Sequence, residues 1–309
     1  MIVLRELPDQ RITDSRPVVA TLGNFDGIHL GHQAIMREVI AGARTCDGLP
    51  TVITFHPHPL RLLAPEKAPR LMLTGQQKEQ LLAELGIEAL IVIPFDRALA
   101  NMPAEDFVRE ILHHRLGVHR LLVGPDYRFG RGRAGGVSLL ARLGSQLGFE
   151  ATAIAPVLVD GDRVSASRIR ELLSRGAVSD AATLLARPFS LVGTIVHGEG
   201  RGTNLLVPTA NLAPENQFLP ARGVYVTRTR WPGGAWEGVT NVGIRPTFGY
   251  RRIVVETFLV DFEGDLYGQR IELDFLERLR DEKHFASAQE LKEQIDRDLL
   301  AFDDWRRVR

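Results

Sequence analysis

Two histidines in a glycine-rich decapeptide are the first side chains whose type and spacing indicate chemistry. The segment GNFDGIHLGH (23–32) places His29 and His32 three residues apart, so both point the same way on a first helical turn. Its three glycines let the backbone turn tightly and approach a ligand closely. The unpaired N–H groups and the positive dipole end of a following helix favour an anion. Either histidine alone would fit a surface turn, but the whole segment predicts an anion site.

Two other loops carry side chains suited to a phosphate-bearing substrate. TFHPHP (54–59) contains His56 and His58. Two histidines in a proline-locked loop are a weak metal signal, so substrate contact is favoured. VGPDYRFGRGRAGG (123–136) forms either a solvated basic loop or a phosphate contact. Its candidate arginines are Arg128, Arg131 and Arg133.

A third cluster lies in VSASRIRELL (164–173), where a loop becomes a helix. Ser165, Ser167 and Arg168 combine hydroxyls with an arginine at a helix start, which suits phosphate oxygens. The same residues also fit an N-cap followed by an amphipathic helix. The two interpretations do not exclude each other.

The second half contains a glycine loop and an oxygen-rich pair in GEGRGTNLLVPTAN (198–211). The loop lacks the Lys-Ser/Thr ending of a Walker A motif, so it is not a P-loop. Thr209 and Asn211 are two residues apart, so both face one side of an extended segment. Hydroxyl and amide oxygens suit Mg²⁺. Alone, this tetrapeptide PTAN would be interpreted as a polar turn.

The first half must position its loops with alternating strands and helices. Buried strands separated by helical segments predict a parallel sheet with helices on both faces. Ligands of such sheets lie beyond the carboxyl ends of the strands, where the loops described above begin. The expected strands are 18–22, 51–55, 89–93 and 120–124, and the expected helices are 32–45, 74–85, 103–115 and 136–147.

The pattern changes after about residue 187, where short alternating segments predict antiparallel strands. Pro232, Gly233 and Gly234 provide a hairpin turn. A helix over 287–305 follows, with Ser287 as N-cap and an apolar face of Leu291, Ile295 and Leu299. These elements predict a small β-barrel closed by one helix. The expected strands are 190–196, 223–230, 236–242, 252–262 and 270–276.

Composition limits the class of protein. The chain has 309 residues, 44% hydrophobic and 25% charged, which is typical of two globular domains. The formal net charge is zero, whereas non-specific nucleic-acid binding needs a basic excess, so we expect no nucleic-acid partner. Cys46 is the only cysteine, which fits a reducing compartment. With no signal peptide or spanning segment recognised, we expect a cytoplasmic protein without membrane partners.

The first-half segments together resemble the HxGH nucleotidyltransferases, and the whole chain resembles the bacterial bifunctional riboflavin kinase/FAD synthetases. The family's amino-terminal motifs, G-x-FDG-x-H-x-GH, TF-x-PHP, VG-x-D-F/Y-x-FG and S-S/A-T/S-x-IR, all match in order. The resemblance implies a doubly wound α/β nucleotidyltransferase domain over residues 1–186. It also implies an antiparallel β-barrel riboflavin kinase domain with a carboxyl-terminal helix over 187–309.

For the first domain, the resemblance implies transfer of AMP from ATP to FMN. ATP phosphates would be contacted by His29, His32, Ser165, Ser167 and Arg168, with Gly23, Asn24 and Phe25 also binding ATP. FMN or the metal ion would be faced by His58, Asp126 and nearby residues, including Arg128.

For the second domain, TNVGIRPTFG (240–249), VETFLVDFEGDLYG (255–268) and FLERLRDEKHF (275–285) match the same family. The resemblance implies that Glu256 is the catalytic base. ATP with Mg²⁺ would be bound by Gly198, Gly200, Thr209 and Asn211, the last two contacting the metal, and Arg280 would contact the flavin. FMN and FAD are then substrate and product rather than redox cofactors, and the oligomeric state is left open.

Three positions depart from the family pattern. Thr203 and Leu206 stand where the family has Arg and Gly, and Phe258 replaces a frequent histidine. One alternative is therefore a single-function FAD synthetase with a weakened kinase domain. Another is a second domain that serves as a flavin-binding sensor or storage module. Because pure binding has no use for a base, Thr209, Asn211 and Glu256 argue for the bifunctional enzyme.

Overall fold

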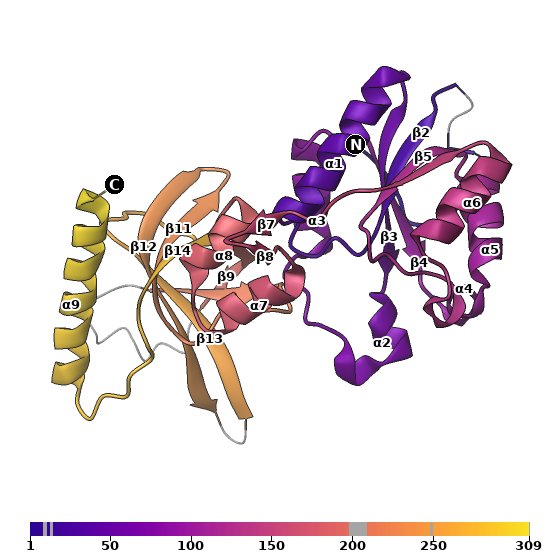
Figure 1. Cartoon of the computed structure of the whole chain (residues 1–309). Helices are drawn as coiled ribbons and strands as arrows, with labels where there is room; N and C mark the ends of the chain where they lie inside the picture. Colours follow the sequence, from indigo (N-terminus) through magenta and orange to yellow (C-terminus); the bar gives the residue numbers. More distant parts are fainter. Residues whose placement is uncertain (9–10, 13–14, 198–208, 248–249, 309) are drawn as a thin grey trace. The chain divides into compact units, whose positions relative to one another are not determined.

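The computed structural model describes residues 1–8, 11–12, 15–197, 209–247 and 250–308. The chain forms two compact units (Figure 1). The first contains residues 1–70 and 75–165, and the second contains residues 71–74 and 166–309. No helix within the described ranges is long and apolar enough to cross a membrane.

The first unit is built on a parallel six-stranded sheet of order β1-β4-β3-β2-β5-β6, which confirms the predicted α/β architecture. β2 is central, and the next strand in sequence lies on one side of it while β5 lies on the other. The order therefore reverses at β2, where open α/β sheets bind their ligands. The strands are β1 (Ile2–Leu4), β2 (Val18–Leu22), β3 (Leu49–His56), β4 (Ala89–Pro94), β5 (Val118–Val123) and β6 (Glu150–Ala153).

Helices cover both faces of this sheet, with α1 and α6 on opposite sides of β2 and β5 (Figure 1). Both faces are covered because alternate residues of β2 point to opposite faces of the sheet. On one face, Val18, Ala20 and Leu22 pack with the apolar residues of η2 and α6. Val19 faces the other way, towards Gly42 of α1. The helices are α1 (Leu30–Thr45), α2 (Pro59–Leu63), η1 (Pro65–Lys67), α3 (Gly75–Glu84), α4 (Arg97–Asn101), α5 (Ala104–Asp106), the π-helical η2 (Phe107–Arg115), η3 (Arg131–Arg133) and α6 (Val137–Leu147); β7 (Leu158–Val159) and β8 (Asp162–Arg163) form a small hairpin.

The second unit contains a closed antiparallel barrel of order β10-β13-β12-β11-β14-β9, as predicted. Pro232 and Gly233 form the predicted hairpin turn, since Trp231 pairs with Gly234. Hydroxyls inside the barrel bond to one another, with Thr240 2.6 Å from Thr227 and 2.8 Å from Thr257. The strands are β9 (Phe189–Val196), β10 (Ala210–Pro214), β11 (Gly223–Trp231), β12 (Gly234–Thr247), β13 (Tyr250–Leu259) and β14 (Arg270–Arg280).

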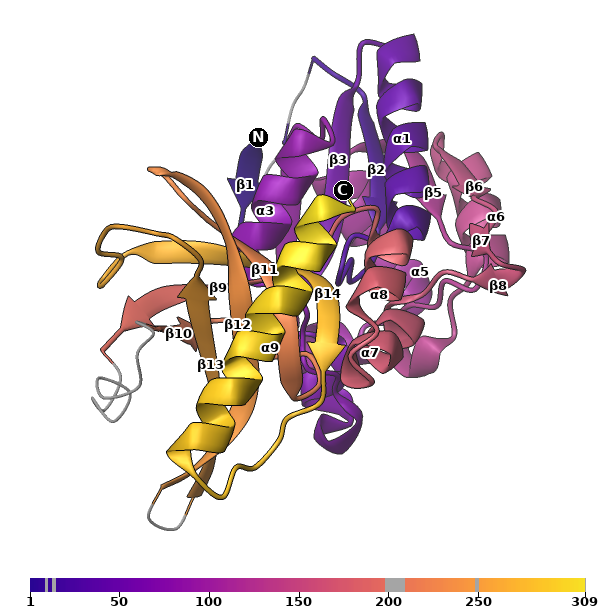
Figure 2. The same cartoon turned by 90° about the vertical axis from the view of Figure 1, so that its left-hand side faces the viewer.

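The helix α9 (Ala288–Arg307) lies across the outer face of this barrel (Figure 2). Ser287 caps it as predicted, because its side chain accepts a hydrogen bond from the Glu290 N–H. The predicted apolar face is only partly right: its three aliphatic residues are half-buried, while Gln294, Asp298 and Phe302 are the buried positions. Polar residues are tolerated there because they are paired, as described below.

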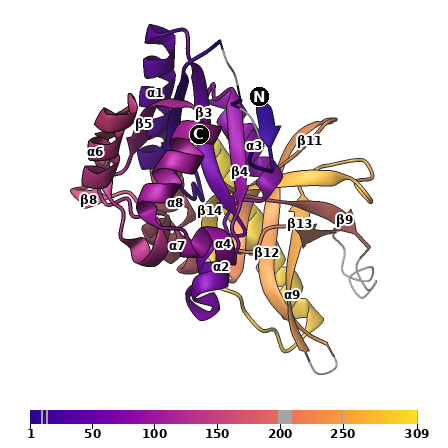
Figure 3. The ribbon, with the colours of Figure 1, turned by 90° about the vertical axis from the view of Figure 1, so that its right-hand side faces the viewer.

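Two helices precede the barrel and pack with it: α7 (Ala166–Ser174) and α8 (Val178–Leu185). α8 lies beside β14 and α7 packs on α8 (Figure 3). The short segment 71–74 also belongs to this unit, where Met72 and Leu73 are buried. The domain boundary expected between residues 186 and 187 stays a prediction.

Candidate functional site

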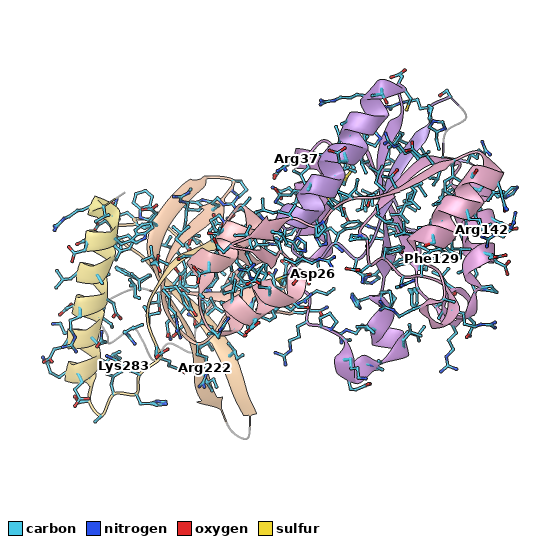
Figure 4. The ribbon with its side chains drawn as sticks, viewed as in Figure 1. Asp26, Arg37, Phe129, Arg142, Arg222 and Lys283 are labelled. Carbon is cyan, nitrogen blue, oxygen red and sulfur yellow. The ribbon has the colours of Figure 1, made fainter. Side chains whose placement is uncertain are left out.

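The loop between β2 and α1 is tightly folded and largely buried. Phe25, Gly27 and Ile28 have φ angles of +46°, +86° and +44°, and left-handed backbone is costly for the two residues with a side chain. Phe25, Ile28 and Asp26, which is labelled in Figure 4, are buried. A Cβ at Gly23 would lie 3.0 Å from the Phe25 ring. Surrounding contacts must therefore hold this loop in place.

The rings of His29 and His32 lie face to face, with centroids 3.7 Å apart and an interplanar angle of 19°. His29 is the N-cap of α1, and its Nδ1 accepts from the His32 N–H at 3.4 Å. A Cβ at Gly31 would lie 3.2 Å from the His29 ring, which explains the glycine between them. The side chains thus point the same way, as their spacing predicts.

The hydrogen bonding fixes the tautomer of each ring. Because Nδ1 of His29 accepts, its proton in the neutral form is on Nε2, which is a donor. The Nδ1 of His32 is buried with no hydrogen-bond partner among the described residues, so an N–H there would be unsatisfied. Burial first, then the charges of His29 and Lys78, lower the pKa of His32 well below its usual value. His32 is therefore a neutral ring with its proton on Nε2.

The end of β3 meets this loop through Asn24. His58 caps α2, with Nδ1 accepting from the Leu60 N–H at 3.2 Å, and its Nε2 lies 3.1 Å from the Asn24 side-chain amide. Because Nδ1 accepts, Nε2 carries the proton when the ring is neutral, and the Asn24 atom nearest to it is the amide nitrogen Nδ2. Lys78 of α3 donates to the main-chain oxygen of Asn24 at 2.8 Å. His56 is exposed beside these residues in the sequence.

The loop after β5 combines an aromatic pair with exposed charge. Tyr127 and Phe129 stack at 5.9 Å, and burial raises the pKa of Tyr127. Asp126 forms an ion pair with Arg163. Close packing against Ala104 requires Gly130, whose φ is +72°. The three candidate arginines of this loop, Arg128, Arg131 and Arg133, are exposed.

The serine-rich segment is divided between the two units. Ser165 belongs to the first unit, whereas Ser167 and Arg168 lie in α7 of the second. The main-chain oxygen of Val164 is 3.7 Å from the position of a Cβ on Gly31. Ser165 therefore follows a residue that approaches the amino end of α1. The ATP contacts expected of these residues, and of Gly23, Asn24 and Phe25, stay predictions.

In the second unit, Glu256 stands between two asparagines on neighbouring strands. It pairs in register with Asn211 of β10 and with Asn241 of β12. Directly opposed residues of adjacent strands project from the same face of a sheet, and all three are half-buried. Their strand neighbours Val255 and Thr257 are fully buried. The carboxylate and two amides therefore share the barrel's outer face.

The metal ion implied for the kinase half fits the residues at this place. Asn211 is half-buried and pairs in register with Glu256, and the exposed Thr209 precedes it by two residues in the chain; hydroxyl, amide and carboxylate oxygens are ligands that suit a hard cation. Among the described residues, no group of three or more His, Cys, Asp or Glu could hold a metal. Gly198, Gly200, Thr203 and Leu206 lie outside the described residues.

Glu282 and Asn241, neither of which is a predicted site residue, meet over Gly243. The Glu282 Oε1 accepts from the Ile244 N–H at 2.9 Å, and Oε2 pairs with Arg222 at 3.2 Å. A Cβ at Gly243 would lie 2.7 Å from Glu282 and 3.0 Å from the Asn241 amide. No sequence signal identifies this pair, because it depends on how the segment after β14 returns over β12. Arg222 and Lys283 mark this region in Figure 4.

Arg280 is engaged within the protein. It forms a bidentate ion pair with Asp298 of α9, at 2.8 and 2.7 Å, and the two side chains are 16% and 9% exposed. Gln294 also donates to Asp298 at 2.9 Å. The guanidinium lies 6.0 Å from the Phe285 ring. Arg280 therefore ties β14 to α9, and its flavin contact stays a prediction.

Comparison with known proteins places both units in enzyme families. The model of the FAD synthetase family matches residues 11–168, and that of the riboflavin kinase family matches residues 185–305. The bifunctional riboflavin kinase/FMN adenylyltransferase of Escherichia coli strain K12 is 38% identical, covering 91% of this chain and 90% of the relative. The protein of the same name from Pseudomonas fluorescens is 37% identical, with 93% of each chain covered.

A crystal structure from Streptococcus pneumoniae, described as a macrolide-efflux protein, is also similar. It is 28% identical, with a TM-score of 0.87, and covers 98% of this chain and 100% of that one. The fold is thus shared over both units. Two successive transferase domains and relatives aligned along nearly their whole length lead to one conclusion: the chain belongs to the bifunctional riboflavin kinase/FMN adenylyltransferase family.

Proposed function

We propose that this chain makes both flavin nucleotides from riboflavin and ATP. The second unit phosphorylates riboflavin to FMN with release of ADP, and the first transfers AMP from ATP to FMN to give FAD and pyrophosphate. The observation that carries this proposal is the occurrence of both family domains in one chain. The roles that we assign to side chains of each domain are given below.

In the adenylyl transfer, a phosphate oxygen of FMN attacks the α-phosphorus of ATP, and the bond to the leaving pyrophosphate breaks. The second pKa of a phosphate monoester is about 6, so this oxygen is ionised at neutral pH and no general base is needed. The reaction needs hydrogen-bond donors around a crowded anionic transition state. We assign this role to the Nε2–H groups of His29 and His32, because Nδ1 of His29 accepts a hydrogen bond and Nδ1 of His32 is buried with no partner among the described residues.

The remaining roles in the first reaction follow the family resemblance. Ser165, Ser167 and Arg168 would bind further phosphate oxygens, and the helix start favours that charge. FMN would be contacted by His58, Asp126 and Arg128, beside the aromatic pair Tyr127 and Phe129. The aromatic pair supports this because flat rings stack on one another.

In the kinase reaction, the 5′-hydroxyl of riboflavin attacks the γ-phosphorus of ATP, ADP leaves, and the hydroxyl must lose its proton. We assign Glu256 as the base that accepts this proton. Its position between Asn211 and Asn241 supports the assignment, because both amides can orient a substrate hydroxyl or phosphate. Thr209 and Asn211 would hold Mg²⁺, which neutralises phosphate charge when bound.

The setting is a further part of the proposal. We place the enzyme in the cytoplasm, with riboflavin, FMN and ATP as its small-molecule partners. The single cysteine and the balanced net charge support this setting, since they fit a reducing compartment and give no basic surplus for nucleic acid.

One incubation tests the proposal against its main alternative. Purified full-length protein receives riboflavin and Mg-ATP, and riboflavin, FMN and FAD are separated by chromatography. We expect FMN first and then FAD. Formation of FAD from added FMN, without phosphorylation of riboflavin, would favour the single-function FAD synthetase instead. Failure with both substrates would overturn the proposal.

A further inference from the structure

Lys78 reaches the histidine loop from a different element. It lies on α3, and its Nζ donates to the main-chain oxygen of Asn24 at 2.8 Å. Burial lowers the pKa of this ammonium, and the Asp26 carboxylate partly offsets the effect. A half-buried cation that is placed beside a buried carboxylate and a main-chain oxygen has little freedom to move.

Asn24 is the point at which three elements meet. Besides Lys78, the Thr54 hydroxyl on β3 lies 3.5 Å from the same main-chain oxygen, and the Asn24 side chain contacts His58. The following residues include Phe25 and Ile28, both with positive φ. Because such a backbone costs free energy, the contacts at Asn24 are needed to hold it. Lys78 provides the one charged contact among those described.

The loop in turn fixes the ring of His32. The Phe25 ring meets it edge-on at 5.1 Å, and the His29 ring stacks on it at 3.7 Å. Displacement of Asn24 would therefore move Phe25 and the cap residue His29 together. A displacement of about 1 Å near reacting atoms can cost ~10²-fold in rate.

We propose that Lys78 is a positioning residue for adenylyl transfer: through the Asn24 carbonyl, its ammonium fixes the Gly23–His29 turn and the two histidine rings. This inference rests on the proposed function of the first unit. Lys78 also contributes positive charge behind His32, which favours the neutral ring that donates from Nε2. His29 and Lys78 act electrostatically on His32, and Asp26 acts on Lys78.

The test uses the full-length chain with Lys78→Met, which keeps the methylenes and removes the charge. FMN is supplied directly, and kcat and KM for ATP are measured for FAD formation. We expect kcat to fall about 10–100-fold while KM changes less than about threefold. Lys78→Arg keeps a charged donor and should retain at least about five times the kcat of Lys78→Met.

Two controls separate positioning from general damage. Lys67→Met removes an exposed lysine of the same unit and should leave FAD formation within about twofold of the wild type. Riboflavin phosphorylation, measured on each preparation, reports the second unit and should not change. If Lys78→Met does not fold, as judged by circular dichroism, the same measurements are made on Lys78→Gln, which also removes the charge. A kcat equal to that of the wild type in whichever of these two uncharged variants is folded would overturn the proposal.

The pH profile gives a readout that a merely structural role would not change. Loss of the Lys78 charge raises the pKa of His32 towards its usual value, so the protonated ring appears at higher pH. The acid limb of FAD formation should therefore move to higher pH relative to Lys67→Met. Protonation of the FMN phosphate affects both variants equally, so it does not contribute to the difference between their pH profiles. A wild-type chain inactive on FMN would refute the proposed function, whereas an active wild type with an unchanged kcat in folded Lys78→Met would refute this inference alone.

Discussion

At the scale of single residues, hydrogen bonds decide the chemical form of the histidines. Nδ1 of His29 accepts a hydrogen bond, and Nδ1 of His32 is buried with no partner among the described residues. When neutral, both rings therefore donate through Nε2. Neutral donors suit a transition state whose charge is spread over phosphate oxygens. The site therefore depends on aligned donors as well as on net positive charge.

The double variant His29→Ala with His32→Ala should abolish most FAD formation and leave riboflavin phosphorylation intact. Removing one such donor costs about 10²-fold or more in rate, and both donors belong to the first unit. The measurement is a time course of flavins after addition of riboflavin and Mg-ATP, in which FMN should accumulate. Undiminished FAD production would contradict the assignment of the two rings.

Glu256→Gln should affect the other reaction. The amide keeps the size of the side chain but cannot accept the hydroxyl proton, so kcat of riboflavin phosphorylation should fall about 10²–10⁴-fold. Glu263→Gln, at an exposed position of the same unit, is the matched control and should be close to wild type. FMN supplied directly should still become FAD in both variants. If Glu256→Gln phosphorylated riboflavin as fast as the wild type, the Glu256 carboxylate would not be the catalytic base and would have only a structural role.

At the scale of elements, long segments with a clear apolar period were predictable from the sequence. Very short strands, and buried positions that depend on an ion pair with another element, were not. The strands of the sheet core and the helix α1 follow from apolar runs and spacing. β1 and β6, with three and four residues, are too short to give a pattern. The apolar periodicity of α9 does not predict that Asp298 is buried. Its burial is possible because Arg280 of β14 forms an ion pair with it.

The candidate site was predictable to the extent that its residues lie in one segment. His29 and His32 are close because a helix places them together. Asn241 joins Glu256 only through strand register, and a slip of one residue would turn it to the opposite face. Lys78 was missed because the position of α3 beside the first loop is a tertiary feature. Neither register nor helix placement can be calculated from local pattern.

The ion pair between β14 and α9 allows a prediction at this scale. Asp298→Ala leaves Arg280 buried without its partner, which should lower the free energy of unfolding of the second unit by about 3–5 kcal/mol. Glu215→Ala is the matched control, because Glu215 forms a bidentate pair with Arg270 in which both side chains are 41% exposed. Its loss should cost at most about 1 kcal/mol.

Tryptophan fluorescence during denaturation measures this difference in the second unit alone. The chain has three tryptophans, and Trp231, Trp236 and Trp305 all lie in that unit. Equal destabilisation by Asp298→Ala and Glu215→Ala would show that burial of the Arg280 pair is unimportant. Flavin binding can be followed on the same samples, which separates loss of the helix contact from loss of a flavin contact.

At the scale of the whole molecule, the two reactions are assigned to two units that each have a core. The chain passes between the units more than once, because residues 71–74 belong to the second unit while the residues before and after them in the sequence belong to the first. Asn216 holds this segment: its amide nitrogen donates to the Met72 oxygen at 2.8 Å, while its oxygen accepts from the Val192 N–H at 2.8 Å. A fragment of the barrel alone leaves Asn216 without the first of these bonds.

The two fragments 166–309 and 187–309 test where the second domain begins. The shorter one follows the boundary expected from sequence, and the longer one retains α7 and α8. Leu173, Leu184 and Leu185 of these helices are fully buried, and the Leu173 oxygen accepts from the Ala221 N–H at 2.8 Å. Burying one leucine contributes about 1.5–3 kcal/mol, so the longer fragment should be more stable by about 3 kcal/mol or more.

Urea unfolding followed by tryptophan fluorescence gives this comparison directly, because both fragments retain all three tryptophans. We expect a cooperative transition for 166–309 and a lower midpoint, or no transition, for 187–309. Both should be assayed for riboflavin phosphorylation, since a closed barrel carries Glu256 and both asparagines in either case. Equal midpoints would place the boundary at residue 187 and show that α7 and α8 contribute little to the barrel. A molten 166–309 would instead show that segment 71–74 is needed to complete its core.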